Sequence, residues 1–449
     1  MSTYRLNSAR HAPDSTEYRA YHARNWRDIP QLARLDKERL FEMEVVSKVF
    51  PFKTNNFVID NLIDWSDVEN DPIFALNFPH REMLMPADFS ALADLIRKNA
   101  DEALITRRVR EIRETLNPHP AGQKEHNIPE LDEEPLPGMQ HKYRETVLFF
   151  PSQGQTCHAY CTFCFRWPQF TGDSVDRFAS REVGNLIAYL RRHPEVTDVL
   201  ITGGDPMIMS SRVLAGYVRP LLAARLPNLR RIRFGTKALT FWPHRFVNDR
   251  DADELLALLG DIADAGLHVA VMAHFNHPRE LESPVVQDAI ARLRESGAEI
   301  RTQSPLLRPV NADPVVWQTM WKKQVDLGCI PYYMFLARDT GAHHHFSVPL
   351  VRAWRIYRDA IAGVSGLART VRGPSMSATP GKVEVLGVSR IGPQKVISLR
   401  FLQGRDPGWV MRPFFAKYDE QATWLDELRP VSGSRWFFEE RPSQLRATA

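Results

Sequence analysis

Residues 156–167 of the chain read Thr-Cys-His-Ala-Tyr-Cys-Thr-Phe-Cys-Phe-Arg-Trp. The segment holds three of the four cysteines, Cys157, Cys161 and Cys164, in the spacing Cys-x3-Cys-x2-Cys. Thiolates are soft ligands that bind zinc or iron–sulfur clusters. Because no fourth cysteine lies nearby in the sequence, these three would leave one iron of a 4Fe–4S cube without a protein ligand. A small molecule could then chelate that iron and take an electron directly from the cluster.

Two other roles for these cysteines stay open. Cysteines in a reduced protein are often buried as small hydrophobic residues, and clustered cysteines often bind zinc in a tetrahedron. Zinc would need a fourth ligand, yet His158 is awkwardly placed beside Cys157, and Cys329 stands alone. We expect Cys329 to be a core residue at the start of a strand. The spacing of the three cysteines resembles that of the radical S-adenosylmethionine (SAM) superfamily, in which SAM fills the open position on the iron.

The bulk composition is that of an ordinary globular protein. The 449 residues are enough for one large domain with an accessory region, and 43% are hydrophobic and 25% charged. The net charge of +4 gives no reason to expect a nucleic-acid partner. No run of 18 apolar residues predicts a membrane span, and the polar first 20 residues do not resemble a signal peptide. Few cysteines, most of them clustered, favour a reducing compartment, so we expect the cytoplasm.

Hydrophobic periodicity divides the chain into three regions. Residues 1–140 predict a mainly helical region, with helices at 37–50 and 90–117 and a linker rich in proline and charge at 118–137. Residues 141–382 alternate between strand-like and helix-like segments. The strands are expected at 146–150, 196–202, 230–235, 268–274, 299–304 and 332–336, and the helices at 181–192, 252–265, 285–296 and 315–327. Residues 383–449 predict a small C-terminal extension, with short strands near 382–387 and 395–401.

Six successive strand–helix units predict an α/β fold with a parallel sheet and helices outside it. We expect a partial (β/α)6 TIM-like barrel of the radical SAM type, although periodicity does not reveal whether such a sheet closes. The cysteine segment follows the first strand. It should therefore lie at the carboxyl ends of the strands, where such folds keep their chemistry.

A second motif ends the second predicted strand, as Gly203-Gly204-Asp205-Pro206. The glycines let backbone groups approach a ligand closely, and Asp205 could accept a hydrogen bond from an ammonium group. Such a sequence on its own is more often only a turn. One strand after the cysteine segment, it favours a site for the methionine amino group of SAM.

Later strand ends carry further motifs, and together they resemble the lysine 2,3-aminomutases, radical SAM enzymes that also carry pyridoxal phosphate (PLP). The matching segments are His-Phe-Asn-His-Pro at 274–278, Gln-Ser-Pro-Leu-Leu-Arg at 303–308, Pro-Tyr-Tyr at 331–333 and His-His-Phe at 344–346. The resemblance extends from about Ser47 to Gly387. It implies that Cys157, Cys161 and Cys164 hold a 4Fe–4S cluster, and that Gly203, Gly204, Asp205, His274 and Gln303 bind SAM.

The resemblance also implies residues for the substrate and for PLP. Arg166 falls where the family holds the α-carboxylate of the substrate, a role that suits a planar guanidinium group. Lys382 falls on the lysine that bonds to PLP, although Gly381 alone survives of the glycine-rich turn before it. A solvated surface arginine and an exposed turn lysine are the ordinary alternatives for these two residues.

The phosphate site of PLP departs from the family pattern. Where the family uses two arginines, this chain has Lys142 and Thr146, and Arg144 could substitute for one of them. The loop before the first cluster cysteine is also about two residues longer than in the family. PLP binding is therefore expected through Lys382, with Lys142 and Arg144 as candidate partners of the phosphate.

Two further positions bear on the substrate. Lysine-specific members place two aspartates around the distal ammonium group, and the matching residues here are Arg338 and Ser375. Asp339 could restore one acid if the register shifts by one residue. A desolvated ammonium group beside Arg338 would cost several kcal/mol, whereas a carboxylate would be stabilised there. We therefore expect an amino acid with an acidic or carboxylate-bearing side chain.

The resemblance thus implies a radical SAM aminomutase that moves an α-amino group from C2 to C3, through a 5′-deoxyadenosyl radical and a PLP aldimine. It further implies an electron donor such as flavodoxin or ferredoxin, and a homo-oligomer. Two alternatives remain: a PLP-free radical SAM enzyme acting on another substrate, and a non-catalytic zinc- or iron–sulfur-binding protein with a sensing role.

Overall fold

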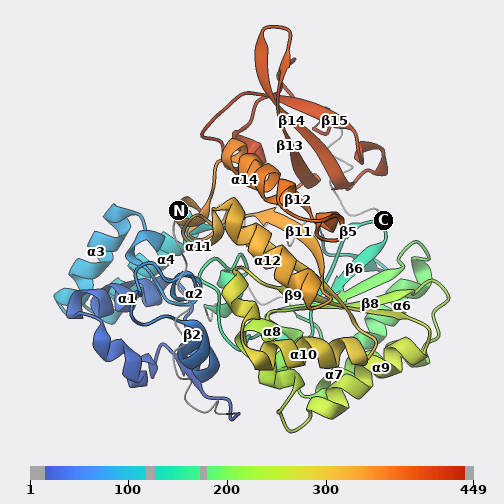
Figure 1. Cartoon of the computed structure of the whole chain (residues 1–449), viewed down its shortest axis with the longest axis horizontal. Coiled ribbons are helices and arrows are strands. Elements are labelled where there is room, and N and C mark those ends of the chain that lie inside the picture. Colours follow the sequence, from blue (N-terminus) through green and yellow to red (C-terminus); the bar gives the residue numbers. More distant parts are fainter. Residues whose placement is uncertain (1–15, 118–126, 172–178, 440–449) are drawn as a thin grey trace.

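The strands predicted between residues 146 and 336 are present, and they lie side by side in one sheet (Figure 1). The computed structural model describes residues 16–117, 127–171 and 179–439. The predicted strands are β6 (Thr146–Phe149), β7 (Asp198–Ile201), β8 (Arg231–Thr236), β9 (His268–His274), β10 (Glu299–Leu306) and β11 (Ile330–Leu336). Neighbouring strands within this set are parallel, and β12 (Arg372–Ser377) adds a further parallel strand beside β11. The predicted α/β class is confirmed.

Antiparallel strands complete both edges of this sheet. β5 (Met139–Tyr143) pairs with β6, and β13 (Gly381–Ile391), β14 (Gln394–Gly404) and β15 (Pro413–Lys417) continue beyond β12. The strand order is β15-β14-β13-β12-β11-β10-β9-β8-β7-β6-β5. The C-terminal strands therefore extend the central sheet, and the β13–β14 hairpin projects from its upper end in Figure 1.

The sheet is open in hydrogen bonding but curled in space. Among the described strands, β5 and β13 share no ladder. Nevertheless, Lys142 Nζ on β5 donates a hydrogen bond of 2.5 Å to the carbonyl of Ala378, which follows β12. β5 and the end of β12, which stand seven places apart in the sheet, thus meet through a side chain, with a cavity between them.

Helices follow most of the parallel strands and cover the outer face of the sheet (Figure 1). The long ones are α6 (Val183–Arg192), α7 (Ser211–Ala223), α9 (Ala252–Asp264), α10 (Pro284–Glu295), α12 (Pro314–Asp326) and α14 (Leu350–Ala362). Three short ones, α8 (Ala238–Phe241), α11 (Arg308–Asn311) and α13 (His343–Phe346), lie in loops. The apolar side of α9, with Leu255, Leu259 and Ile262, is fully buried, as expected for a helix that packs on a sheet.

The N-terminal region is mainly helical, as predicted, and lies beside the sheet (Figure 1). It contains α1 (Lys37–Val49), α2 (Pro72–Asn77), α3 (Pro86–Arg97), α4 (Glu102–Leu116) and a small ladder of β1 (Ala20–His22) with β2 (Lys53–Asn55). The single helix predicted at 90–117 is wrong, because the chain breaks between α3 and α4. Asn99 takes a left-handed conformation with φ 47°, and the Asp101 carboxylate caps α4 by accepting from the Ala103 N–H.

Part of the predicted linker, residues 118–126, lies outside the described residues. Its remainder holds two short paired strands, β3 (Glu130–Leu131) and β4 (Glu134–Pro135). Cys329 is 3% exposed and directly precedes β11, as predicted. Within the ranges that the structure covers, every helix is too short or too polar to cross a bilayer.

Candidate active site

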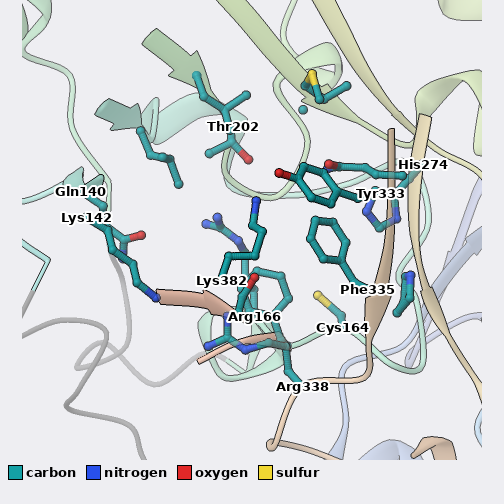
Figure 2. Close-up of a pocket in the computed structure, with 18 of the residues that line it drawn as sticks. Gln140, Lys142, Cys164, Arg166, Thr202, His274, Tyr333, Phe335, Arg338 and Lys382 are labelled. Carbon is teal, nitrogen blue, oxygen red and sulfur yellow. The ribbon is translucent and has the colours of Figure 1, made fainter. Parts of the chain in front are cut away.

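One large cavity lies at the carboxyl ends of the parallel strands, inside the curl of the sheet (Figure 2). Its volume is about 1260 Å³, and residues of every strand from β5 to β14 line it. Ligand sites usually measure about 300–1,000 Å³. The cavity is therefore large enough for more than one small molecule.

The three clustered cysteines line this cavity, on the loop that follows β6. All three are free and half-buried. Among the described residues, no three His, Cys, Asp or Glu side chains converge on a point that a single metal ion could occupy. A 4Fe–4S cube takes one thiolate on each of several irons, so its ligands stand apart around the cube. The donor set thus fits a cluster better than a tetrahedral zinc ion.

The N-terminal region holds the backbone of the cysteine loop. Lys53 Nζ donates to the carbonyl of Cys157 at 2.7 Å, and the Tyr18 hydroxyl donates to the carbonyl of His158 at 2.7 Å. Asn55 Nδ2 donates to the same His158 carbonyl at 3.2 Å. These contacts span more than 100 positions in the chain, and no local sequence pattern pointed to them. The helical region therefore shapes the cluster site from outside the sheet.

The Gly203-Gly204 turn packs directly against the chain just before Cys157. A Cβ atom on Gly204 would lie 2.5 Å from the carbonyl oxygen of Thr156, and one on Gly203 would lie 2.9 Å from that of Gly154. The Asp205 N–H also donates to the Thr156 carbonyl at 2.8 Å. The glycines are thus required where two backbones meet, and both line the cavity in which SAM is expected.

Asp205 joins the ends of β7 and β8. Its carboxylate accepts from the Met207 N–H at 2.9 Å, from the Thr236 hydroxyl at 2.7 Å and from the Lys237 N–H at 2.9 Å. The residue is 3% exposed, and burial raises its pKa to about 6. The predicted contact of Asp205 with the SAM ammonium group stays a prediction, because these hydrogen bonds are all to the chain.

Lys237 is a site residue that the sequence motifs did not reveal. Its Nζ donates to Glu280 Oε1 at 2.7 Å, to Asn276 Oδ1 at 2.9 Å and to the His274 carbonyl at 3.3 Å. The ion pair is buried, so Lys237 joins the ends of β8 and β9 beneath the cavity. The one feature of the sequence that could have indicated this role is the position of the lysine directly after a buried strand.

His274 and Gln303 lie next to each other in register on β9 and β10, and both line the cavity. Burial, with the nearby Lys237, lowers the pKa of His274 to about 3. The imidazole is therefore neutral at physiological pH. The structure brings both predicted residues to the same wall, and their contact with SAM stays a prediction.

Lys382 enters the cavity from the start of β13 (Figure 2). Its Nζ lies 3.9 Å from the centre of the Tyr333 ring and 5.4 Å from that of Phe335. Burial, reinforced by the cations Arg233 and Arg372, lowers the pKa of Lys382 to about 7. A neutral amine is the form that attacks an aldehyde, so this environment fits the predicted bond to PLP and not an exposed turn lysine.

Arg166 and Arg338 lie near the same aromatic ring. Their guanidinium carbons are 5.3 Å and 5.2 Å from the centre of the Phe165 ring. Arg338 Nε is buried without a hydrogen-bond partner among the described residues, and its distance to the nearest oxygen of Asp339 is 3.9 Å. Burial lowers the pKa of Arg166 to about 10. These two cations are therefore available to an anionic ligand (Figure 2).

The remaining predicted residues are distributed unevenly. Lys142 lines the cavity from β5, whereas Arg144 is exposed at its rim. Ser375 is not brought to the cavity: it is fully buried in β12, and its hydroxyl lies 3.5 Å from the Met334 carbonyl. Arg405, just after β14, lines the cavity and was not predicted, because it lies far from every motif in the sequence.

No protein-family model matches the chain. A putative L-lysine 2,3-aminomutase from Aquifex aeolicus is 30% identical over 400 residues, which are 89% of this chain and 93% of the relative. The L-lysine 2,3-aminomutase of Haemophilus influenzae is 28% identical over 243 residues, which are 53% of this chain and 68% of the relative. A solved structure of Streptococcus suis SuiB with its precursor peptide SuiA covers 61% of this chain and 57% of SuiB, with 13% identity and a TM-score of 0.34, too remote to inform function.

The Aquifex relative matches nearly its whole length, and the matched region includes the cysteines and the strand ends described above. The chain belongs to the lysine 2,3-aminomutase family of radical SAM enzymes, and this membership implies a 4Fe–4S cluster, SAM and PLP as its cofactors.

Proposed function

We propose that the protein is a radical SAM aminomutase that moves an α-amino group from C2 to C3 of an amino acid with a carboxylate-bearing side chain. The observation that carries this proposal is the pair Arg166 and Arg338. Both guanidinium groups lie beside Phe165, in the cavity that also holds Cys164 and Lys382. Two carboxylates of one substrate would satisfy two cations that the chain itself leaves poorly compensated.

The charges of the whole cavity support the same substrate class. Eight basic and five acidic side chains line it. Of the acids, Asp198 is paired with Arg233 at 2.7 Å, and the Asp205 carboxylate is surrounded by donors of the chain. Basic side chains outnumber acidic ones around the cavity, so lysine, with its second ammonium group, fits it poorly.

When bound, the cluster and SAM supply a carbon radical that removes hydrogen from the substrate, and PLP carries the migrating amino group. The chain supplies orientation. Arg166 holds one carboxylate, Arg338 holds the other, and the neutral amine of Lys382 binds the coenzyme. Tyr333 and Phe335 form an aromatic wall beside Lys382, with rings 5.0 Å apart, which keeps water from that side of the site.

The proposal includes the cellular setting. All four cysteines are free, which fits a reducing compartment such as the cytoplasm. Reduction of the cluster calls for a one-electron donor of the flavodoxin or ferredoxin type. We also propose that the curled sheet is the partial barrel of radical SAM enzymes, and that the enzyme forms a homo-oligomer.

The test is a substrate screen with the anaerobically reconstituted protein, SAM, PLP and a reductant. Amino acids deuterated at C3 are offered one at a time, and deuterium in 5′-deoxyadenosine is measured by mass spectrometry. We expect transfer from carboxylate-bearing amino acids and none from lysine. A protein that never cleaves SAM would be a binding or sensing protein instead. Turnover that needs no PLP, with Lys382 dispensable, would favour the PLP-free alternative.

The arginine pair is tested with Arg338→Gln. We expect a KM at least about tenfold higher for the carboxylate substrate, because one charge-assisted contact is lost, with unchanged SAM cleavage in the absence of substrate. Arg390→Gln, an exposed change at the far end of β13, is the matched control. Equal KM values for Arg338→Gln and the parent enzyme would contradict the proposed substrate class.

A further inference from the structure

We infer that Lys142 and Arg405 together form the binding site for the phosphate group of the coenzyme that Lys382 holds. The inference rests on the proposed function and gives it a specific anion site. Neither Arg405 nor its region belongs to any motif of the sequence, and the residue reaches the cavity only through the fold.

The two cations are held by neighbouring carbonyl groups. Lys142 Nζ donates to the carbonyl of Ala378 at 2.5 Å, and Arg405 Nε donates to the carbonyl of Thr379 at 2.9 Å. Ala378 and Thr379 are consecutive residues, four and three positions before Lys382. One short segment therefore fixes both cations and leads directly into the lysine that binds the coenzyme.

Tyr143, on β5, lies close to the amino groups of both Lys142 and Lys382. Its ring centre lies 5.4 Å from Lys142 Nζ and 5.9 Å from Lys382 Nζ. Figure 2 shows Lys142 and Lys382 in the same cavity, on side chains that come from β5 and β13. Arg405 is anchored a second time by Asn127 Oδ1, which accepts from its Nη2 at 2.5 Å.

The chemistry of these groups suits a phosphate monoester. The partner of Lys142 Nζ is a carbonyl oxygen, which positions the cation without neutralising it. Burial, with the nearby cations Arg338, Arg405 and Lys382, lowers the pKa of Lys142 well below its usual value. A bound dianion would reverse that shift and would accept from the guanidinium group of Arg405.

The other candidates for this role fit less well. Arg144 is exposed at the rim and its carbonyl, not its guanidinium group, contacts His141. Arg166 and Arg338 lie against Phe165, next to the cluster cysteines. Lys142 and Arg405 flank the segment before Lys382 instead, so a phosphate bound by them would lie next to that lysine.

The test compares PLP with pyridoxal, which lacks the phosphate. The anaerobically reconstituted enzyme is titrated with each compound and reduced with borohydride, and the labelled fraction of Lys382 is measured by peptide mass spectrometry. We expect Arg405→Met and Lys142→Met each to weaken labelling by PLP at least about tenfold while labelling by pyridoxal stays within about twofold. Inorganic phosphate should compete with PLP in the parent enzyme but not in these variants. Arg390→Met is the charge-matched control.

The possible results distinguish a failure of the phosphate site from a failure of the proposed function. Undiminished PLP labelling in both variants would overturn the phosphate site and leave the proposed function intact. An equal loss of PLP and pyridoxal labelling would also overturn it, since that pattern reflects a purely structural role. Failure of PLP and of pyridoxal to label Lys382 in the parent enzyme would refute the use of PLP in the proposed function and, with it, this inference.

Discussion

Lys382 lies in surroundings that differ strongly from those of a solvated lysine. Three aromatic rings, of Tyr143, Tyr333 and Phe335, lie within 6 Å of its Nζ, and the cations Arg233 and Arg372 act on it. Burial and these two cations disfavour the charged ammonium, and they outweigh the attraction of the rings for a cation. The chain thereby prepares the neutral amine at a pH where most lysines are protonated.

The pKa of Lys382 leads to a pH-dependence that can be measured. Because the pKa of a lysine amine is lowered here to about 7, the neutral form dominates above that pH and falls about tenfold per unit below it. We expect the rate of pyridoxal labelling at Lys382 to rise through pH 7 and then level off. Replacing Arg372 with Gln removes a nearby cation, so the pKa should rise and the midpoint should move to higher pH.

The control for this shift is Arg369→Gln, an exposed change just before β12. It should leave the midpoint where it is. A labelling profile with its midpoint near the usual lysine pKa in the parent enzyme would contradict the account of Lys382.

At the scale of elements, the cysteine loop is held by two segments that lie far apart in the sequence. The turn after β7 packs against its start, and the segment around β2 holds the carbonyls of Cys157 and His158. A loop of this length would have many conformations on its own. The two contacts select the one in which the three thiols face the cavity.

The turn after β7 can be tested with a pair of glycines. Gly204→Ala would place a methyl group 2.5–2.7 Å from backbone atoms of Thr156, so we expect a loss of about 1–3 kcal/mol in the free energy of unfolding and a lower iron content. Gly216→Ala, in α7, meets nothing within 4 Å and should stabilise the protein by about 0.5–1 kcal/mol. Urea unfolding measures both. Equal effects of the two changes would contradict the packing described for the turn.

The segment around β2 can be tested through Lys53. Lys53→Met removes the hydrogen bond to the Cys157 carbonyl and keeps the aliphatic stem, so the loop should hold its cluster less firmly. Partners one step removed from a metal ligand typically change metal affinity by about 10–100-fold. We expect iron loss to a chelator to be at least about tenfold faster, followed by the fading of cluster absorbance. Lys48→Met, on the exposed side of α1, should release iron at the parent rate.

At the scale of the whole molecule, the curled sheet gathers cations from strands that are distant in sequence. Lys142, Arg166, Arg338, Lys382 and Arg405 come from five different segments and line one cavity. Their mutual repulsion costs free energy, which a bound anion relieves. We therefore expect the cavity as a whole to favour anionic ligands.

This excess of positive charge predicts a simple selectivity among inhibitors. Dicarboxylates such as glutarate should compete with the amino acid substrate, because they offer two anions to the arginine pair. Diamines such as cadaverine, of the same length and opposite charge, should not compete. Steady-state inhibition at two salt concentrations measures this, with weaker glutarate inhibition at higher salt. Inhibition by cadaverine equal to that by glutarate would contradict the charge argument.

The sequence predicted the parts of this molecule that depend on local pattern. Alternating strands and helices, the cluster cysteines and the buried Cys329 could all be read from spacing and periodicity. The break at Asn99 was missed because helical periodicity on both sides continues through it, and the conformation of a single residue decides the break.

Residues that act through long-range contacts could not be predicted from local sequence patterns. Lys53, Lys237 and Arg405 are ordinary cations in the sequence, and their roles appear only when β2, β8 and β14 are brought beside the strand ends. Ser375 shows the converse: its spacing in the sequence predicts a substrate position, whereas the structure buries it in β12 between neighbouring strands. Alignment by spacing does not record which way a side chain points.

The contact between Lys142 and the Ala378 carbonyl has a consequence for the order of assembly. The contacts that hold the cysteine loop come from residues between Tyr18 and Phe346, so they can form while the last part of the chain is still being synthesised. The side of the coenzyme pocket that Lys142 and Arg405 form is incomplete until Arg405 has left the ribosome. It follows that the cluster can be loaded before the coenzyme binds. A chain truncated before Arg405 would lack that side of the coenzyme pocket but would keep the contacts that hold the cysteine loop.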